Sequence, residues 1–481
     1  MKLAKSILLG AAAGLATVAA ASAADLPSRK SAPVEYVKVC NAYGAGFFYI
    51  PGTDTCLRVG GLVLAEGRAV WPVMATRSPA NIAVGNPTGI ANSKFNRDRY
   101  GSSALGRLEL DARTQTGFGT LRAFARIDSY FGTAWTANTG NIGTAGGAGS
   151  ATSATTAAAQ RETTMINKAF IQFAGLTAGR AQSMFDFYAD ALNWELLRGS
   201  NATTNLLAYT ATFGGGFSAT LSIEDETGRR QRAGVVVVPG APAAVDVGGT
   251  RRPDIVANLR VDQGWGSAQL SGALHKNSAS TAGAAPFSVE KNGWAVQGGV
   301  KINLPMLAAG DALYLQAVYQ KGASSYMNGL NLVDVEGVGA TRHMGMGAWR
   351  LAGSPGITPF DFDCIMTAPG VCKQQKGYAI TAAFQHYWTP TVSQAIYGSY
   401  MKTKYDTAAL VAGAPTTNWS EVRVGTNVMW SPVKGFGIGA EVMYMGLKQS
   451  SPNAAVQGVL NAVNQTKQHE WETRIRVQRA F

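Results

Sequence analysis

The end of the chain alternates strictly between apolar and polar side chains. In HEWETRIRVQRAF, residues 469–481, one set contains Trp471, Ile475 and Val477, and the other set is charged. A β-strand turns successive side chains to opposite faces, so the pattern predicts a strand with one apolar and one ionic face. A half-buried strand of a soluble sheet often alternates in this way, but its polar face is seldom so ionic.

The same unit recurs along the chain. RLELDARTQ (107–115) and LRAFARIDSY (121–130) alternate similarly on either side of a glycine-rich turn, which predicts an antiparallel hairpin. By this rule we expect about sixteen strands. They should start near residues 57, 103, 119, 164, 176, 205, 216, 252, 266, 292, 311, 376, 392, 420, 436 and 469.

The connections between these strands alternate between short and long. Tight turns are expected near Gly117, Gly175, Gly215, Gly264, Pro305, Pro390 and Lys434, and long loops at 72–98, 132–163, 183–204, 227–250, 279–291, 324–375, 406–418 and 449–468. Long loops at one end and tight turns at the other are typical of bacterial outer-membrane barrels. Within lipid every backbone amide needs a partner in the protein, and a sheet provides one only by closing.

The expected fold is therefore an all-β, transmembrane antiparallel β-barrel of about 16 strands. Its turns would be periplasmic and its long loops extracellular. The apolar face would meet lipid, and the charged face would line a lumen wide enough to hold water. A secreted β-solenoid or sandwich, with an apolar core, is the rival architecture.

Composition adds little to this picture. The 481 residues carry a formal net charge of +13. Glycine and alanine occur throughout and no charged or Ser-rich linker divides the chain, which favours a single barrel domain at 57–481. The arginines occupy alternate strand positions instead of forming a patch with aromatic residues, so nucleic acid is not an expected partner.

The N-terminus has the features of an export signal. Lys2 and Lys5 precede an apolar stretch that ends in Ala21-Ser22-Ala23, which predicts a signal peptide at 1–23, cleaved before Ala24. An uncleaved anchor is the alternative. Further along, the sequence has no apolar run of about 18 residues, as a membrane-spanning helix would need. We expect an exported protein of the bacterial outer membrane, with residues 24–56 as a periplasmic segment leading into the first strand.

The four cysteines are even in number, as disulfide pairing in an exported protein requires. Cys40 with Cys56, and Cys364 with Cys372, are the candidate pairs. Free or metal-binding thiols are the alternative, although no C-x-x-C motif is present.

One segment carries a family resemblance. VEYVKVCNAYGAGFFYIPGTDTCLRVGG, residues 34–61, resembles the N-terminal region of the general porins of alphaproteobacteria, and the terminal Phe481 matches their pattern. The resemblance extends over essentially the whole mature chain. It implies a sixteen-stranded porin, usually a homotrimer, that passes small hydrophilic solutes by passive diffusion. It also implies contact with outer-membrane lipid and lipopolysaccharide, and makes Phe481 part of the signal read by the barrel-assembly machinery.

In porins of this kind the third long loop folds into the lumen and narrows it. Counting places that loop at residues 183–205, where Asp186, Asp190 and Glu195 are the expected constriction carboxylates. An ordinary surface loop is the alternative. The expected pore-lining basic residues are Arg58, Arg107, Arg113, Arg122, Arg126 and Arg180. Opposed charges across the neck would favour polar solutes. The net positive charge of the chain argues for anion selectivity, whereas three carboxylates at the neck favour cation selectivity.

We find no sign of an enzyme. HEWET is not an H-E-x-x-H zinc motif because Thr473 replaces the second histidine, and the four histidines are scattered. No P-loop, nucleophile elbow or dinucleotide-binding fingerprint is present, so no catalytic residue, metal or cofactor is expected. A channel specific for a sugar or an anion is the main alternative function; an adhesin or structural barrel and an outer-membrane enzyme are the others.

Overall fold

The computed structural model describes residues 38–71, 76–77, 90–92, 100–133, 160–229, 245–247, 249–281, 288–328, 363–368, 371–407, 417–462 and 466–481. These belong to two compact units, Met1–Cys56 and Leu57–Phe481. The expected signal peptide, most of the loop at 132–163 and much of the insertion at 324–375 lie outside the described residues.

The described part of the first unit is held by a disulfide. Cys40 and Cys56 are bonded, as expected, with their Cα atoms 5.9 Å apart. Between them lie the 3-10 helix η1 (Asn41–Tyr43) and the short strand β1 (Phe48–Tyr49). The two cysteines and Phe47 are buried together, so a small apolar cluster surrounds the crosslink.

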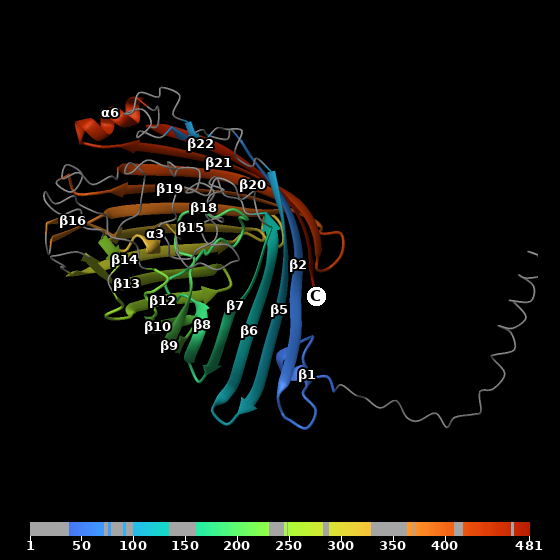
Figure 1. Cartoon of the computed structure of the whole chain (residues 1–481). Coiled ribbons are helices and arrows are strands. Elements are labelled where there is room, and N and C mark those ends of the chain that lie inside the picture. Colours follow the sequence, from blue (N-terminus) through green and yellow to red (C-terminus); the bar gives the residue numbers. More distant parts are fainter. Residues whose placement is uncertain are drawn as a thin grey trace, which may run out of the picture. The chain divides into compact units, whose positions relative to one another are not determined.

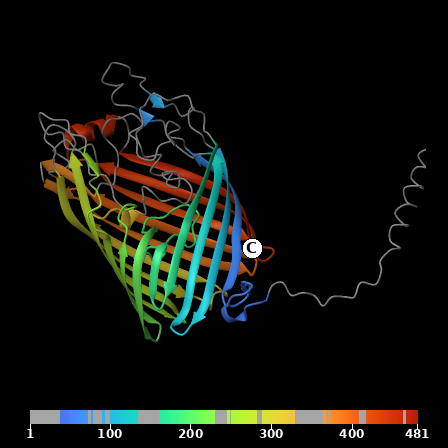
Figure 2. The same ribbon diagram turned by 60° about the horizontal axis from the view of Figure 1, so that its bottom comes forward.

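The second unit is a closed antiparallel barrel, as the alternation predicted, and its strands lie side by side in chain order (Figures 1 and 2). Its sixteen strands are β2 (Cys56–Trp71), β5 (Tyr100–Thr116), β6 (Gly119–Thr133), β7 (Gln160–Phe173), β8 (Leu176–Gln182), β9 (Thr203–Gly214), β10 (Phe217–Glu224), β12 (Asp254–Gln263), β13 (Gly266–Thr281), β14 (Ser288–Asn303), β15 (Ala312–Lys321), β18 (Lys376–Thr389), β19 (Val392–Lys404), β20 (Asn418–Trp430), β21 (Phe436–Ser450) and β22 (Lys467–Ala480).

The first and last barrel strands close the sheet. β2 pairs with β22 from Leu62↔Ala480 to Trp71↔Trp471, and it pairs with β5 on its other side. Gly61 and Phe481 exchange two backbone hydrogen bonds of 3.1 Å at the seam. A side chain at Gly61 would collide with the Phe481 ring and with the Arg107 carbonyl, so this close approach requires glycine.

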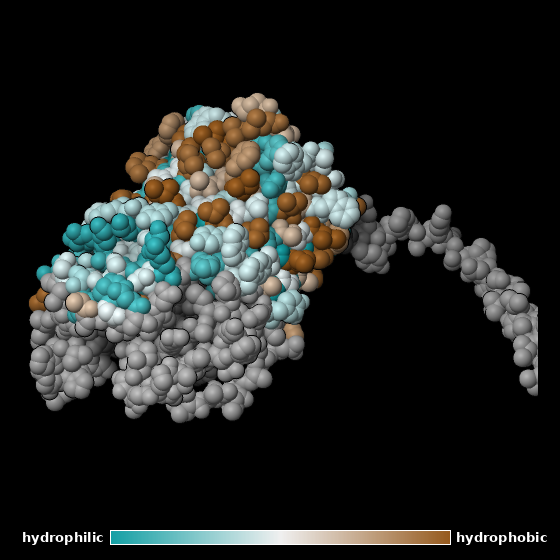
Figure 3. Space-filling model, turned by 90° about the horizontal axis from the view of Figure 1, so that it is seen from above, coloured by the Kyte–Doolittle hydropathy of each residue, from teal (hydrophilic) through white to brown (hydrophobic). Residues whose placement is uncertain are grey.

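The barrel is apolar outside and polar inside, the reverse of a soluble protein. On β22, Ile475 is 63% exposed on the outer face, whereas its neighbour Arg474 is 2% exposed. Figure 3 shows hydrophobic side chains concentrated over one part of an outer face and hydrophilic ones over another. The exposed outward residues include Leu207, Leu221, Leu259, Leu270, Ile380 and Ile396. This face suits lipid.

The remaining described elements belong to the long connections. They are the hairpin of β3 (Thr76–Arg77) and β4 (Ile90–Asn92), β11 (Val245–Val247), which pairs with β13, the hairpin of β16 (Cys364–Ala368) and β17 (Val371–Gln374), and the helices α3 (Ser325–Asn328) and α6 (Ala454–Ala462). The second expected disulfide, Cys364–Cys372, joins β16 to β17. No helix in the described part of the chain is long and apolar enough to cross a membrane.

Candidate functional site

The third long loop, residues 183–202, leaves β8 and reaches β9 through the interior of the barrel (Figure 1). Its backbone bonds to inward side chains of distant strands: Tyr188 N donates to Gln316 on β15 at 3.0 Å, and Arg198 N donates to Ser399 on β19 at 3.0 Å. Further wall side chains that bond to the loop are Asn258, Gln269, Gln297, Thr381, Asn427, Glu441 and Arg474. The loop is therefore docked against the wall that runs from β12 to β22.

Ion pairs between side chains hold the far end of the loop. Arg474 on β22 donates to the Glu195 carboxylate at 2.5 Å and to the Trp194 carbonyl at 2.7 Å. Arg198 donates to Glu421 on β20 at 2.6 and 2.9 Å. Linked ion pairs join ten side chains, which we call the anchor network: Glu66, Glu195, Glu421, Glu441 and Glu472 with Arg68, Arg198, Arg423, Arg474 and Arg476.

The anchor network has equal numbers of acidic and basic groups and is almost inaccessible to solvent. It pairs five carboxylates with five guanidinium groups, and both Arg474 and Glu195 are at most 2% exposed. Buried charges are tolerated when they are paired, and each member of the network has an oppositely charged partner. The charged face of the last strand thus lies partly beneath the third loop instead of bordering open water along its whole length.

The expected constriction carboxylates are largely engaged inside the protein. Glu195 belongs to the anchor network. Asp186 is 9% exposed, accepts from Gln182 and Ala202 N, and lies 3.5 Å from Arg229. Asp190, at a positive φ of 55°, accepts bonds from other loop residues, including Leu197 N at 2.9 Å. These acids hold the loop's shape, so little of their charge is presented to solute.

Aromatic side chains of the loop pack on the same wall. Tyr188 donates to Asn193 at 2.6 Å, and burial raises the pKa of Tyr188 far above its usual value, so its hydroxyl remains a donor. Arg476 lies 4.4 Å over the Trp194 ring. These contacts add packing to the ionic attachment of the loop.

Wall glycines allow this close packing, and they provide a first prediction. A Cβ at Gly299 would collide with the Phe187 ring, whereas one at the neighbouring Gly298 would meet nothing within 4 Å. Gly299→Ala should therefore destabilise loop docking by about 1–3 kcal/mol through overpacking. The measurement is the thermal unfolding midpoint in detergent. Gly298→Ala is the matched control, and adding Phe187→Ala should restore part of the loss; equal midpoints for both glycine variants would contradict the expectation.

Opposite the docked loop stands a surface that we call the basic wall: Arg58, Arg107, Arg113, Arg122, Arg126 and Lys168. The register pairs Arg107 with Asp128 and Arg113 with Arg122, which places them on one inward face. Arg107 binds Asp128 at 2.7 and 2.8 Å, while Arg113 and Arg122 share Asp111. With the acids Glu109, Asp111 and Asp128 the wall holds six positive and three negative charges, an excess of 6 − 3 = +3.

Arg180 corrects one expectation, because it does not line the lumen. It pairs with Asn205 in the register that also pairs Leu176 with Tyr209. Leu176 and Tyr209 are exposed on the outer face, and Arg180, four residues from Leu176, shares it. Its Nε donates to the carbonyls of Ile166 and Asn167, where the β6–β7 register shifts. The other five predicted arginines are on the inward face.

Sequence reasoning missed the wall half of the anchor network. Glu421, Arg423, Glu441 and Arg474 all lie on polar strand faces that the alternation identified as inward. Their presence inside the barrel was thus foreseeable. Their pairing with the loop was not, because Arg198 and Glu421 are more than two hundred positions apart and no local pattern links them.

Comparisons with known proteins agree with this architecture. The family model described as "Porin subfamily" matches residues 25–474. The porin Omp2b of Brucella suis is 30% identical over 285 residues, covering 55% of this chain and 64% of the relative. Omp2b of Brucella abortus (strain 2308) is 30% identical over 271 residues, covering 55% and 63%. The matches therefore span less than two thirds of these relatives.

Among solved structures, the outer membrane channel DcaP of Acinetobacter baumannii is similar in fold. It has a TM-score of 0.55 at 13% identity, with 90% of this chain and 99% of that chain covered. A family match over nearly the whole chain, together with this barrel fold, supports an outer-membrane location. The chain belongs to the porin family.

Proposed function

We propose that the protein forms a water-filled channel for the passive diffusion of small hydrophilic solutes and ions across the outer membrane. The observation that carries this proposal is the docked third loop facing a basic wall inside a closed barrel. Family membership favours a channel over an enzyme. The third loop would form the constriction, with Asp186, Asp190 and Glu195 fixing its position.

We further propose that the channel prefers anions. The anchor network is neutral and the loop carboxylates have partners within the protein, whereas the basic wall has an excess of three positive charges. Side chains of the basic wall are partly open, with Arg58 43% and Arg113 27% exposed. Charge of one sign along a pore biases which ions enter it. This reverses the sign that the loop acids suggested.

The test is single-channel recording of the purified protein in a planar bilayer under a salt gradient. Large ohmic steps with a reversal potential of the anion-selective sign are expected. A cation-selective sign would reject the basic wall as the selectivity element. Saturable solute flux would favour a substrate-specific channel, and a silent bilayer would favour a structural barrel.

A homotrimer is the proposed assembly, and the outer face of β6–β9 supports it. Arg180 and Asn205 share this face with the hydrogen-bonded pair Ser129 and Thr164. An arginine facing the bilayer midplane costs about 2–4 kcal/mol, so polar groups on an outer wall are better placed against another subunit than against lipid. We propose that other copies of this chain cover this face.

The substitution Arg180→Leu tests whether Arg180 faces lipid or another subunit. Against lipid the change should stabilise the barrel, whereas at a subunit contact it should lower the temperature at which the trimer dissociates. We expect the second result, measured by native mass and by gel mobility of unheated samples. Leu221→Ile, on the outer face of β10, is a control that should leave dissociation unchanged. A higher dissociation temperature for Arg180→Leu would place Arg180 in lipid.

Export and assembly complete the proposal. Residues 1–23 would act as a cleaved signal peptide, residues 24–56 as a periplasmic segment, and residues 57–481 as the barrel domain. Phe481, 66% exposed at the seam, is available to the barrel-assembly machinery. The outer face would meet membrane lipid and lipopolysaccharide. Mass spectrometry of the mature protein should give an N-terminus at Ala24.

A further inference from the structure

A buried cluster of metal-ligand types lies inside the barrel, away from the anchor network. Glu226 follows β10, Asp254 begins β12 and His275 lies on β13, and each offers a ligand atom within 4.8 Å of the others. All three side chains are fully buried. Imidazole and carboxylate are both ligands of Zn²⁺ and similar divalent ions.

Neighbouring groups hold these side chains in place. The His275 Nδ1 atom lies 2.9 Å from both Asp254 oxygens, and its Nε2 atom lies 3.3 Å from Asp363. The Tyr326 hydroxyl donates to Asp254 at 2.6 Å. Metal sites characteristically have such supporting bonds around their ligands.

Further buried carboxylates lie around the cluster. Five carboxylates are nine-tenths or more buried here: Asp186, Glu224, Glu226, Asp254 and Asp363. The electrostatic contacts place the cationic groups Arg229 and His275 among them, and Lys168 also acts on Asp186. Attraction to these buried carboxylates would favour a divalent cation at the cluster.

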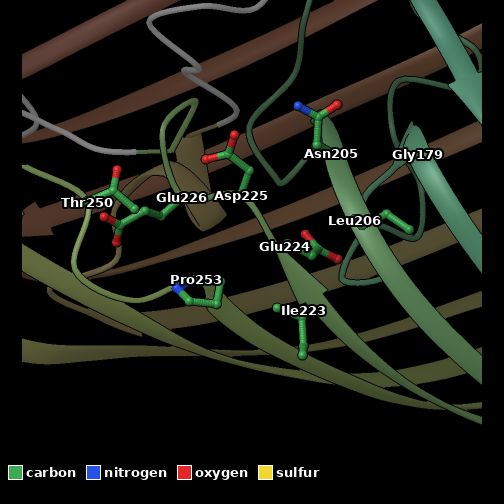
Figure 4. Close-up of a pocket in the computed structure, with 9 residues that line it drawn as sticks. All are labelled: Gly179, Asn205, Leu206, Ile223, Glu224, Asp225, Glu226, Thr250 and Pro253. Atoms are coloured by element: carbon green, nitrogen blue, oxygen red, sulfur yellow. The ribbon is translucent and has the colours of Figure 1, made fainter.

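An access route reaches one ligand. A cavity of about 480 Å³ is lined by Glu224, Asp225 and Glu226 together with residues of β8 and β9 and of the segment before β12. Figure 4 shows Glu226 beside Thr250 in this cavity, on the side away from Asn205 and Gly179. An ion entering from the cavity would thus meet carboxylates before it reaches His275.

We infer that Glu226, Asp254 and His275 form a binding site for one divalent transition-metal ion, of which Zn²⁺ is the representative, with Asp363 supporting the imidazole from the opposite edge of the ring. Binding would use a neutral imidazole and displace its extra proton to solvent. The ion would join the segment after β10 to β12 and to β13. The site would thereby stiffen the loop end of the barrel without touching the anchor network.

The test uses the untagged full-length protein in detergent, stripped with a chelator and then titrated with ZnCl₂. Calorimetry and metal analysis after dialysis should give one high-affinity Zn²⁺ per chain, and the thermal unfolding midpoint should rise with Zn²⁺. His275→Gln should weaken binding by about 10–100-fold, as loss of a metal contact typically does. Glu226→Gln, a milder change, should also weaken it.

His386→Gln is the matched control, because His386 also binds a carboxylate, Asp311 at 2.6 Å, but on a distant part of the barrel. It should retain wild-type Zn²⁺ affinity. Absence of stoichiometric Zn²⁺ binding in the wild type would overturn the inference. So would unchanged affinity in a folded Glu226→Gln or His275→Gln protein, or a loss in His386→Gln as large as theirs. None of these outcomes bears on conductance, so the channel proposal is tested separately.

Discussion

Replacing Arg474 with methionine will detach the far end of the third loop and destabilise the barrel by about 3–5 kcal/mol, the usual loss when one partner of a buried ion cluster is removed. The guanidinium group of Arg474 contacts Glu195 at 2.5 Å, Glu472 at 2.9 Å, and Glu66 and Glu441 at 3.6 Å. Without it, four buried carboxylates are left close together with too little positive charge. Mutual repulsion should then push Glu195, and the loop with it, off the wall.

Two measurements follow this release. Single-channel conductance should become larger and noisier, because the loop no longer holds one position in the lumen. The thermal unfolding midpoint should fall as well. Arg479→Met, five residues along β22 on the outer face, removes the same group without affecting the anchor network, and should leave conductance unchanged. Wild-type conductance and midpoint in Arg474→Met would show that the network does not hold the loop.

Strand positions followed closely from the sequence. The sixteen observed strands begin within four residues of the expected positions, the largest differences being at Gln160 and Ser288. Lipid outside and water inside impose a period of two on every strand, so each strand can be predicted from its own residues alone. Strand ends were less well defined, because alternation continues beyond the membrane into the loops.

The side of the barrel that a residue faces could also be predicted from neighbouring residues of its strand. Arg180 was predicted wrongly because this periodicity was not applied to it. Leu176 and Arg180 are four residues apart in LTAGRAQ, so period two already put them on the same side. The charge of Arg180 suggested a position in the lumen, but the strand register places Arg180 on the outer face with Leu207. This exception to the apolar outer face is the reason for proposing a subunit contact there.

The docking of the third loop could not be derived in this way. Three acids in a loop at the neck suggested exposed negative charge, but Asp190 folds the loop on itself and Glu195 pairs with Arg474. These partners are set by the three-dimensional path of the loop, not by any period in the chain. The proposed anion selectivity therefore rests on the inward residues of the basic wall instead of the loop acids.

Substituting Arg58 and Lys168 together with glutamine should weaken or reverse anion selectivity. The double change lowers the excess charge of the basic wall from +3 to +1 and leaves the short ion pairs of Asp111 with Arg113 and Arg122 intact. Two charges near the path of an ion, each at about 8 Å in screened water, alter the difference between anion and cation energies by roughly 1 kcal/mol. The anion-to-cation permeability ratio should therefore fall about fivefold.

The reversal potential under a salt gradient measures this ratio directly. Lys448→Gln and Lys467→Gln, paired with each other in the register of β21 and β22 near the loop end, form the control double variant and remove the same net charge far from the basic wall. If both double variants shift the potential equally, total charge sets the selectivity. A shift confined to Arg58→Gln/Lys168→Gln would assign the selectivity to the basic wall.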